Sequence, residues 1–200
     1  MNSIQFLAAI QKFATPLFTT SEAAAYLSIS EHSAGKYLKA LEDQQIVTRL
    51  KRGKWALTSG ELDPLQIPDF LTAPKESYIS LHSALFFHGV IEQIPSRIYA
   101  VTLDRSNVVK TLLGVISFHH CHPKFFAGFE YIKPYLKMAS PEKALVDYFY
   151  FSPSKSRQFK TLPEIEIPKS FSWKKAHQYC QMIPSGRTRG LVFTRLTELS

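Results

Sequence analysis

The signals of two helices and a hairpin follow one another in FTTSEAAAYLSISEHSAGKYLKALEDQQIVTRLKRGKWAL, residues 18–57. Thr20 or Ser21 is predicted to cap a short helix that ends at Leu27, because a side-chain oxygen there accepts a backbone N–H that the first turn leaves unpaired. Ser28-Ile29-Ser30 then predicts a turn with an apolar residue in its middle. Ser30 is expected to cap the next helix.

This second helix is predicted to run from Glu31 to about Gln45. Its apolar residues recur at the i, i+4, i+7 spacing of one buried stripe, which consists of Ala34, Leu38 and Leu41. Cations lie on the opposite side, and the DNA major groove admits a helix whose N-terminal residues meet base edges. The residues predicted to contact base edges or to position this helix on DNA are His32, Ser33, Lys36 and Lys39.

The segment from Thr48 to Leu57 predicts two short strands joined at Lys51-Arg52-Gly53. Gly53 can take the positive φ that a tight turn demands. Four of the six residues from Arg49 to Lys54 are Lys or Arg. The cations expected to contact phosphates or the minor groove are Arg49, Lys51, Arg52 and Lys54.

A further helix is predicted at the N-terminus, where Ile4, Leu7 and Ile10 recur at helical spacing. Together with the two helices and the basic hairpin, it predicts a winged helix-turn-helix DNA-binding domain over residues 1–60. Such domains also serve as protein-protein modules. The alternative is therefore a protein-interaction module whose basic surfaces bind an acidic partner, without specific DNA binding.

The positive charge of the chain is unevenly distributed. The formal net charge is +8 over 200 residues. Residues 1–60 carry 7 Lys and Arg against 4 Asp and Glu, residues 61–123 carry 4 against 6, and residues 124–200 carry 13 against 6. The last third therefore predicts a second surface for nucleic acid or for an acidic partner. Its candidate residues are Lys174, Lys175, Arg187, Arg189 and Arg195.

The remaining composition is that of a folded protein, with 45% hydrophobic residues. Two cysteines in a chain of this length do not form a disulfide framework, so reduced thiols and a cytoplasmic location are expected. The N-terminus lacks the pattern of a secretion signal, and no apolar run approaches the length that spans a bilayer. We expect no contact with a membrane.

Three prolines between residues 59 and 74 predict a linker over 61–74, followed by a mixed α+β domain over 75–200. Ser80 is expected to cap a helix through His88. Strands are predicted over 97–103, 115–119, 125–132 and 135–138. Ser140, Pro141 and Glu142 predict the start of a buried helix. A last pair of helices is predicted over 173–182 and 191–199.

No group of residues predicts catalysis, a metal site or a cofactor. His119-His120-Cys121-His122 contains zinc-binding residue types, but neighbours on a strand point to opposite faces, and two ligands do not close a tetrahedral site. Asp147 is expected to be a buried salt-bridge partner, of Arg97 or Arg105. The sequence has no nucleophile elbow, phosphate loop or dinucleotide fingerprint. We therefore expect the chain not to be an enzyme.

Two segments carry a family resemblance. YISLHSALFFHG, residues 78–89, followed by IPSRIYAVT, residues 94–102, resembles the start of the C-terminal domain of AbiEi-type antitoxins. ASPEKALVD, residues 139–147, looks like the second hallmark of that family. The resemblance implies a type IV toxin-antitoxin regulator that binds its own promoter DNA, forms a homodimer and counteracts a nucleotidyltransferase-like toxin.

Overall fold

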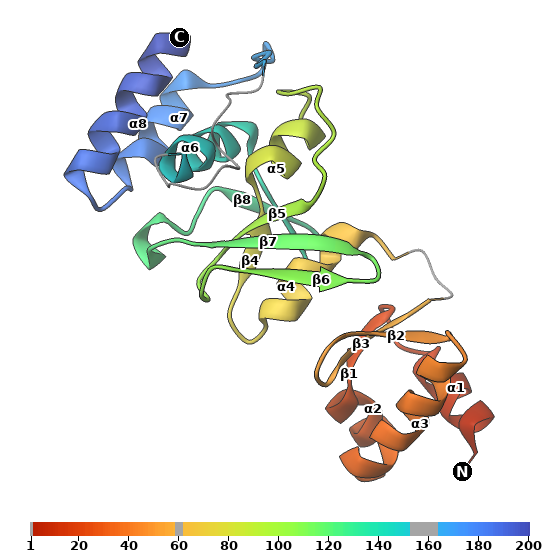
Figure 1. The fold of residues 1–200 in the computed structure, drawn as a ribbon. Coiled ribbons are helices and arrows are strands. Elements are labelled where there is room, and N and C mark those ends of the chain that lie inside the picture. Colours follow the sequence, from red (N-terminus) through yellow and green to blue (C-terminus); the bar gives the residue numbers. More distant parts are fainter. Residues whose placement is uncertain (1, 59–61, 153–163) are drawn as a thin grey trace.

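Figure 1 shows the fold in the computed structural model, which describes residues 2–58, 62–152 and 164–200. Helices are combined with two sheets, one of three strands near the N-terminus and one of six strands in the middle of the chain. The α+β class is therefore confirmed. None of the helices in these three ranges is long and apolar enough to cross a membrane.

The N-terminal unit contains three helices and a small antiparallel sheet. In chain order its elements are α1 (Ser3–Ile10), β1 (Leu17–Thr19), α2 (Thr20–Tyr26), α3 (Glu31–Asp43), β2 (Val47–Lys51) and β3 (Lys54–Leu57). β3 lies between β1 and β2. Each helix begins after a polar cap whose side chain accepts a backbone N–H, and these caps are Asn2, Thr19 and Ser30.

α3 and the hairpin follow the prediction from the sequence. The predicted stripe of Ala34, Leu38 and Leu41 is buried, although α3 ends two residues earlier than expected. Lys51 pairs with Lys54, so that the two residues between them form the turn, and Gly53 has a φ of +74°. Glycine adopts this left-handed conformation without the steric cost that other residues meet.

The two preceding helices differ in detail from the prediction. α2 is capped by Thr19, one residue before the earlier of the two expected caps, because Glu22 completes a capping box by accepting the N–H of Thr19 at 2.7 Å. In α1, Phe6 and Ile10 are buried whereas Ile4 is 77% exposed. Phe6 stacks on Tyr37 of α3, so an aromatic contact orients α1.

The second unit is built on a mixed sheet in the order β6-β7-β5-β4-β9-β8. Its strands are β4 (Ser77–Ile79), β5 (Ile98–Thr102), β6 (Asn107–Thr111), β7 (Gly114–His120), β8 (Phe129–Lys133) and β9 (Leu136–Ala139). β5 is parallel to β7 and β4 to β9, while the other pairs are antiparallel. The four predicted strands correspond to β5, β7, β8 and β9, and β8 begins only after a 3-10 turn over Pro123–Phe125. The sequence patterns predict neither β4 nor β6.

Helices cover this sheet on both sides, as Figure 1 shows. α5 (Leu81–Phe87) packs against α6 (Pro141–Phe151), which also contacts α7 (Trp173–Gln181) and α8 (Gly186–Leu199). α6 begins as predicted, with Ser140 accepting the N–H of Lys143 at 3.2 Å. α8 begins at Gly186 instead of at Leu191, because Ser185 caps it.

The segment predicted as a linker is folded over its described residues, 62–74. This segment forms the 3-10 turn Pro64–Gln66 and α4 (Ile67–Thr72), and its apolar side chains belong to the core of the second unit. Pro64 and Pro68 each lie in the first turn of a helix, where a missing N–H costs no hydrogen bond, and Pro74 follows α4. The second unit therefore begins no later than Pro64.

The two units share an apolar interface. Leu17, Leu50 and Ala56 from the small sheet belong to the same buried cluster as Ile67 and Phe70 of the second unit. The residues that α1, α2 and α3 bury form a separate cluster with Phe18 and Trp55. The helices thus cover one face of the small sheet, and the second unit covers the other. α3 lies on the side of this sheet that is away from the second unit (Figure 1).

Candidate nucleic-acid interface

The outward face of α3 carries three of the predicted DNA-binding residues. His32, Lys36 and Lys39 are exposed. At about 100° per residue, their spacing places them within an arc of about 60°, opposite the buried stripe. Figure 1 shows this helix on the side of the small sheet away from the second unit, so the arc faces solvent.

The residues of this face differ in how much charge and hydrogen-bonding capacity they offer. Ser33 is half-buried, and its hydroxyl accepts the hydroxyl of the cap Ser30 at 2.9 Å. Lys39 pairs with Asp43 at 2.9 Å and with Glu42 at 3.2 Å, and these hydrogen bonds raise the pKa of Lys39. Lys36 forms no ion pair within the described residues. It is the uncompensated cation of α3.

Three hairpin cations, Arg49, Lys51 and Arg52, are exposed. The guanidinium of Arg49 lies 5.8 Å from the ring centroid of Trp55, which holds its stem against the sheet. Lys51 lies in a small depression that it shares with Asp104 of the second unit. A hydrogen bond from Lys75 lowers the pKa of Asp104, and the charge of Lys51 lowers it further.

Lys54 is placed differently from the prediction. Its ammonium donates to three carbonyl oxygens at the end of α4, those of Phe70 at 2.5 Å, Ala73 at 3.0 Å and Leu71 at 3.1 Å. An ammonium has three donors, so this arrangement uses them all. Burial lowers the pKa of Lys54. Lys54 therefore joins the hairpin to the second unit, and its ammonium is not presented to a nucleic acid.

The basic residues of the C-terminal helices lie at the end of the molecule opposite α3 (Figure 1). Lys174 and Lys175 are exposed on α7, and Arg187 is exposed at the start of α8. Arg189 is half-buried and donates to the carbonyl of Ile183 at 3.2 Å, while Arg195 lies 3.5 Å from Glu198. The predicted second basic surface is therefore separate from α3, and two of its five residues have internal partners.

The His119 to His122 segment continues β7 into a loop. His119 Nε2 lies 3.0 Å from Ser117 Oγ, and His120 Nδ1 lies 3.0 Å from the carbonyl oxygen of Asp104. His122 accepts the N–H of Lys124 at 3.1 Å. Among the described residues, no three or more His, Cys, Asp or Glu side chains are grouped so that they could hold a metal ion.

A buried ionic cluster lies in the core of the second unit. Lys143 and Asp147 form an ion pair on α6, and neither side chain is exposed. Asp147 also accepts the hydroxyl of Ser80 at 2.7 Å and that of Tyr78 at 3.0 Å. The ammonium of Lys143 lies 3.4 Å from the ring centroid of Phe125. Burial lowers the pKa of Lys143 and raises that of Asp147, although their mutual attraction opposes both shifts.

This cluster corrects two predictions. Asp147 is a buried ion-pair partner as expected, but its cation is Lys143 and not Arg97 or Arg105. Ser80 precedes α5 without capping it through its side chain, because its hydroxyl is used by Asp147. The spacing of Lys143 and Asp147, four residues on a helix, was a signal in the sequence that could have identified the pair.

The cluster also joins two segments that are distant in the sequence. Tyr78 and Ser80 belong to residues 78–89, while Lys143 and Asp147 belong to residues 139–147. These are the segments that carry the resemblance to AbiEi-type antitoxins. A scan of protein-family models and a search of curated proteins find no match to this chain.

Proposed function

We propose that the chain is a DNA-binding transcriptional regulator whose N-terminal unit is a winged helix-turn-helix. The observation that carries this proposal is the geometry of α3, which follows α2 after a short turn and presents His32 and Lys36 opposite its buried stripe. A helix that is anchored on one side and cationic on the other suits the major groove. The hairpin β2–β3 then takes the place of the wing.

The proposed DNA surface consists of His32, Ser33, Lys36, Lys39, Arg49, Lys51 and Arg52. Lys54 is left out because its ammonium binds the end of α4. Arg52 sits in the hairpin turn and is exposed, so it is the hairpin residue best placed for a phosphate. In this arrangement the three hydrogen bonds of Lys54 join the hairpin to the end of α4.

We further propose that the regulator is a cytoplasmic, homodimeric antitoxin that represses its own promoter and counteracts a nucleotidyltransferase-like toxin. The support is the resemblance of residues 78–102 and 139–147 to AbiEi-type antitoxins, together with their meeting at Asp147. Both segments contribute residues to one buried cluster, as expected if they form the core of one domain.

DNA binding is tested with the DNA upstream of the chain's own gene, in a fluorescence-anisotropy titration at several salt concentrations. Each lost phosphate contact should reduce the salt slope by about one, so we expect a reduction of about two for the double variant Lys51→Ala/Arg52→Ala. Lys36→Ala should weaken specific binding. Lys54→Met is the matched control and should leave the slope unchanged, because its cation contacts protein.

Competition with unrelated DNA separates this proposal from the protein-interaction alternative. Two observations support the alternative. Lys39 is paired with Asp43, and two hairpin cations, Lys51 and Lys54, lie near the second unit. Equal competition by unrelated DNA would show that the basic surfaces do not select an operator. An unchanged affinity in Lys36→Ala would remove α3 from the interface.

The antitoxin activity is tested by co-expressing the chain with a nucleotidyltransferase-like protein that is encoded next to it. We expect the chain to restore growth that the toxin inhibits. Lys36→Ala should restore growth equally, since Lys36 lies on α3, outside the unit that carries the resemblance to the antitoxins. Growth that stays inhibited with the wild-type chain would exclude the antitoxin function and leave the DNA-binding proposal standing.

A further inference from the structure

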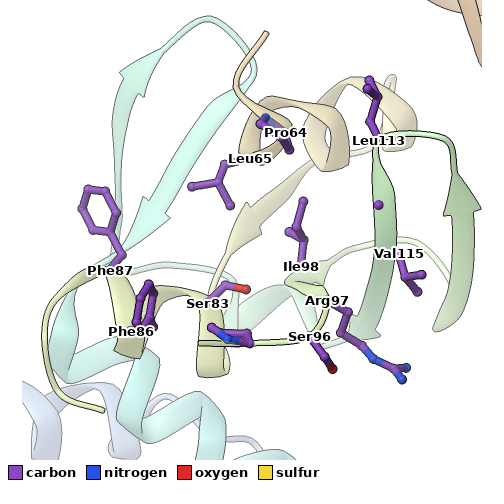
Figure 2. A pocket seen from close by; sticks show the side chains of 12 residues that line it. Pro64, Leu65, Ser83, Phe86, Phe87, Ser96, Arg97, Ile98, Leu113 and Val115 are labelled. Atoms are coloured by element: carbon purple, nitrogen blue, oxygen red, sulfur yellow. The ribbon is translucent and has the colours of Figure 1, made fainter. Parts of the chain in front are cut away.

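A second feature of the C-terminal unit is a cavity of about 390 Å³. Figure 2 shows it between the end of α5, the segment before β5, and the turn that joins β6 to β7. Cavities of this size, of about 300–1,000 Å³, are typical of sites for small organic molecules. It lies in neither the proposed DNA surface nor the buried ionic cluster.

The walls of the cavity are mainly apolar. Figure 2 shows the side chains of Phe86, Leu65, Ile98 and Leu113 around it, with Phe87 at its edge. Phe87 is 56% exposed and Phe86 is 39% exposed, so two aromatic rings of α5 are open to solvent here. A group of solvent-exposed apolar side chains that lines a cavity indicates a binding site more often than single exposed apolar residues do.

The polar side chains of the lining are all hydrogen-bond donors. They belong to Arg97, Ser83 and Ser96, and Figure 2 shows the guanidinium of Arg97 at the rim, directed away from Leu65 and Phe87. Ser83 Oγ accepts the N–H of Tyr99 at 2.9 Å, which leaves the hydroxyl proton of Ser83 to donate. No carboxylate lines this cavity in the described part of the chain.

Arg97 supplies the charge of the site. Within the described residues its guanidinium forms no ion pair. An arginine can hold a carboxylate through two parallel hydrogen bonds, which gives both charge and orientation. An apolar cavity with one uncompensated cation at its rim therefore complements a ligand with an apolar body and a single anionic group at one end.

We propose that this cavity binds a small apolar carboxylate, with the hydrocarbon body between α5 and the β6–β7 turn and the carboxylate on Arg97. The proposal does not depend on DNA binding. It predicts a preference for the anion over an uncharged molecule of the same length, because only the anion gains the interaction with Arg97.

Calorimetric titration of the full-length chain with decanoate and with decanol tests this preference. We expect decanoate to bind, and to bind more tightly than decanol. Arg97→Gln should weaken decanoate binding at least about tenfold, because the two parallel charge-assisted hydrogen bonds of the guanidinium are lost, and leave decanol binding within about twofold. Arg105→Gln is the matched control, since Arg105 is exposed outside the cavity, and it should bind both as the wild type does.

Leu113→Glu is a second variant, because this side chain is already 36% exposed and the substitution places a carboxylate in the lining. It should weaken decanoate binding more than decanol binding. Thermal unfolding of both variants near the wild-type temperature confirms that they fold. Failure of the wild type to bind decanoate, equal affinity for decanoate and decanol, or equal losses of both in Arg97→Gln would each overturn the proposal.

Discussion

Lys143→Met should lower the free energy of unfolding by about 3–5 kcal/mol, because it leaves the carboxylate of Asp147 buried without its cation. Methionine fills much of the same volume, so the loss is electrostatic more than steric. The two hydroxyls that donate to Asp147 remain, but neither carries the charge that compensates it. Urea unfolding followed by circular dichroism measures the change.

α3 provides a matched control for this substitution. Lys39 and Asp43 have the same spacing as Lys143 and Asp147, with their charged atoms 2.9 Å apart, but both side chains are more than 60% exposed. Exposed pairs at this spacing contribute about 0.3–0.5 kcal/mol. Lys39→Met should therefore leave the unfolding free energy nearly unchanged. Similar losses in the two variants would mean that burial does not determine the effect.

The double variant Lys143→Met/Asp147→Asn tests the electrostatic explanation. Asparagine keeps an oxygen that can accept from Tyr78 and Ser80, and no charge is left in the core. We expect the double variant to be more stable than either single variant. Its loss of unfolding free energy is then smaller than the sum of the two single losses, and the difference is the coupling energy of the pair. Additive losses would assign the cost to packing alone.

The sequence predicts elements whose signals lie within a few residues. α3 and α6 both begin after a serine cap, and α3 buries the stripe that its periodicity indicates. The hairpin turn is set by Gly53. Such signals are local because capping and helical spacing act between residues three or four positions apart.

The sequence fails where distant segments compete for a side chain. Ser80 has the position of a helix cap, yet Asp147 takes its hydroxyl from 67 residues away. Lys54 has the pattern of a wing cation, yet α4 offers three carbonyls that satisfy its ammonium. The segment before Lys75 is rich in proline, yet it forms α4 and buries Ile67. These outcomes depend on tertiary contacts, which no local pattern contains.

The candidate DNA surface shows the same division. The outward face of α3 follows from residue spacing alone, because the buried stripe fixes what lies opposite it. The contribution of each cation does not follow from the sequence. It does not show that Lys36 forms no ion pair within the described residues, or that Lys51 shares a small depression with Asp104. The cavity beside Arg97 was not expected from the sequence, because its walls come from four separate segments.

Acidification is expected to destabilise the chain through His119. Burial lowers the pKa of His119 from 6.5 to about 4, and the charges of His82 and Arg97 lower it further. Between these two values the unfolded chain binds a proton that the folded chain does not, so stability is lost as the pH falls from about 6.5 toward 4. The loss should be about 2 kcal/mol between pH 7 and pH 5, and about 3 kcal/mol when complete.

His119→Gln should remove this part of the pH dependence, because glutamine does not titrate. The measurement is the unfolding free energy in urea at pH 7 and at pH 5, compared between variant and wild type. Other acidic groups titrate in the same range, so the difference between the two proteins isolates the imidazole. His32→Gln is the control, since His32 is exposed on α3 and its replacement should keep the wild-type dependence. An equal loss of stability in His119→Gln and the wild type would show that His119 is protonated alike in the folded and unfolded chain.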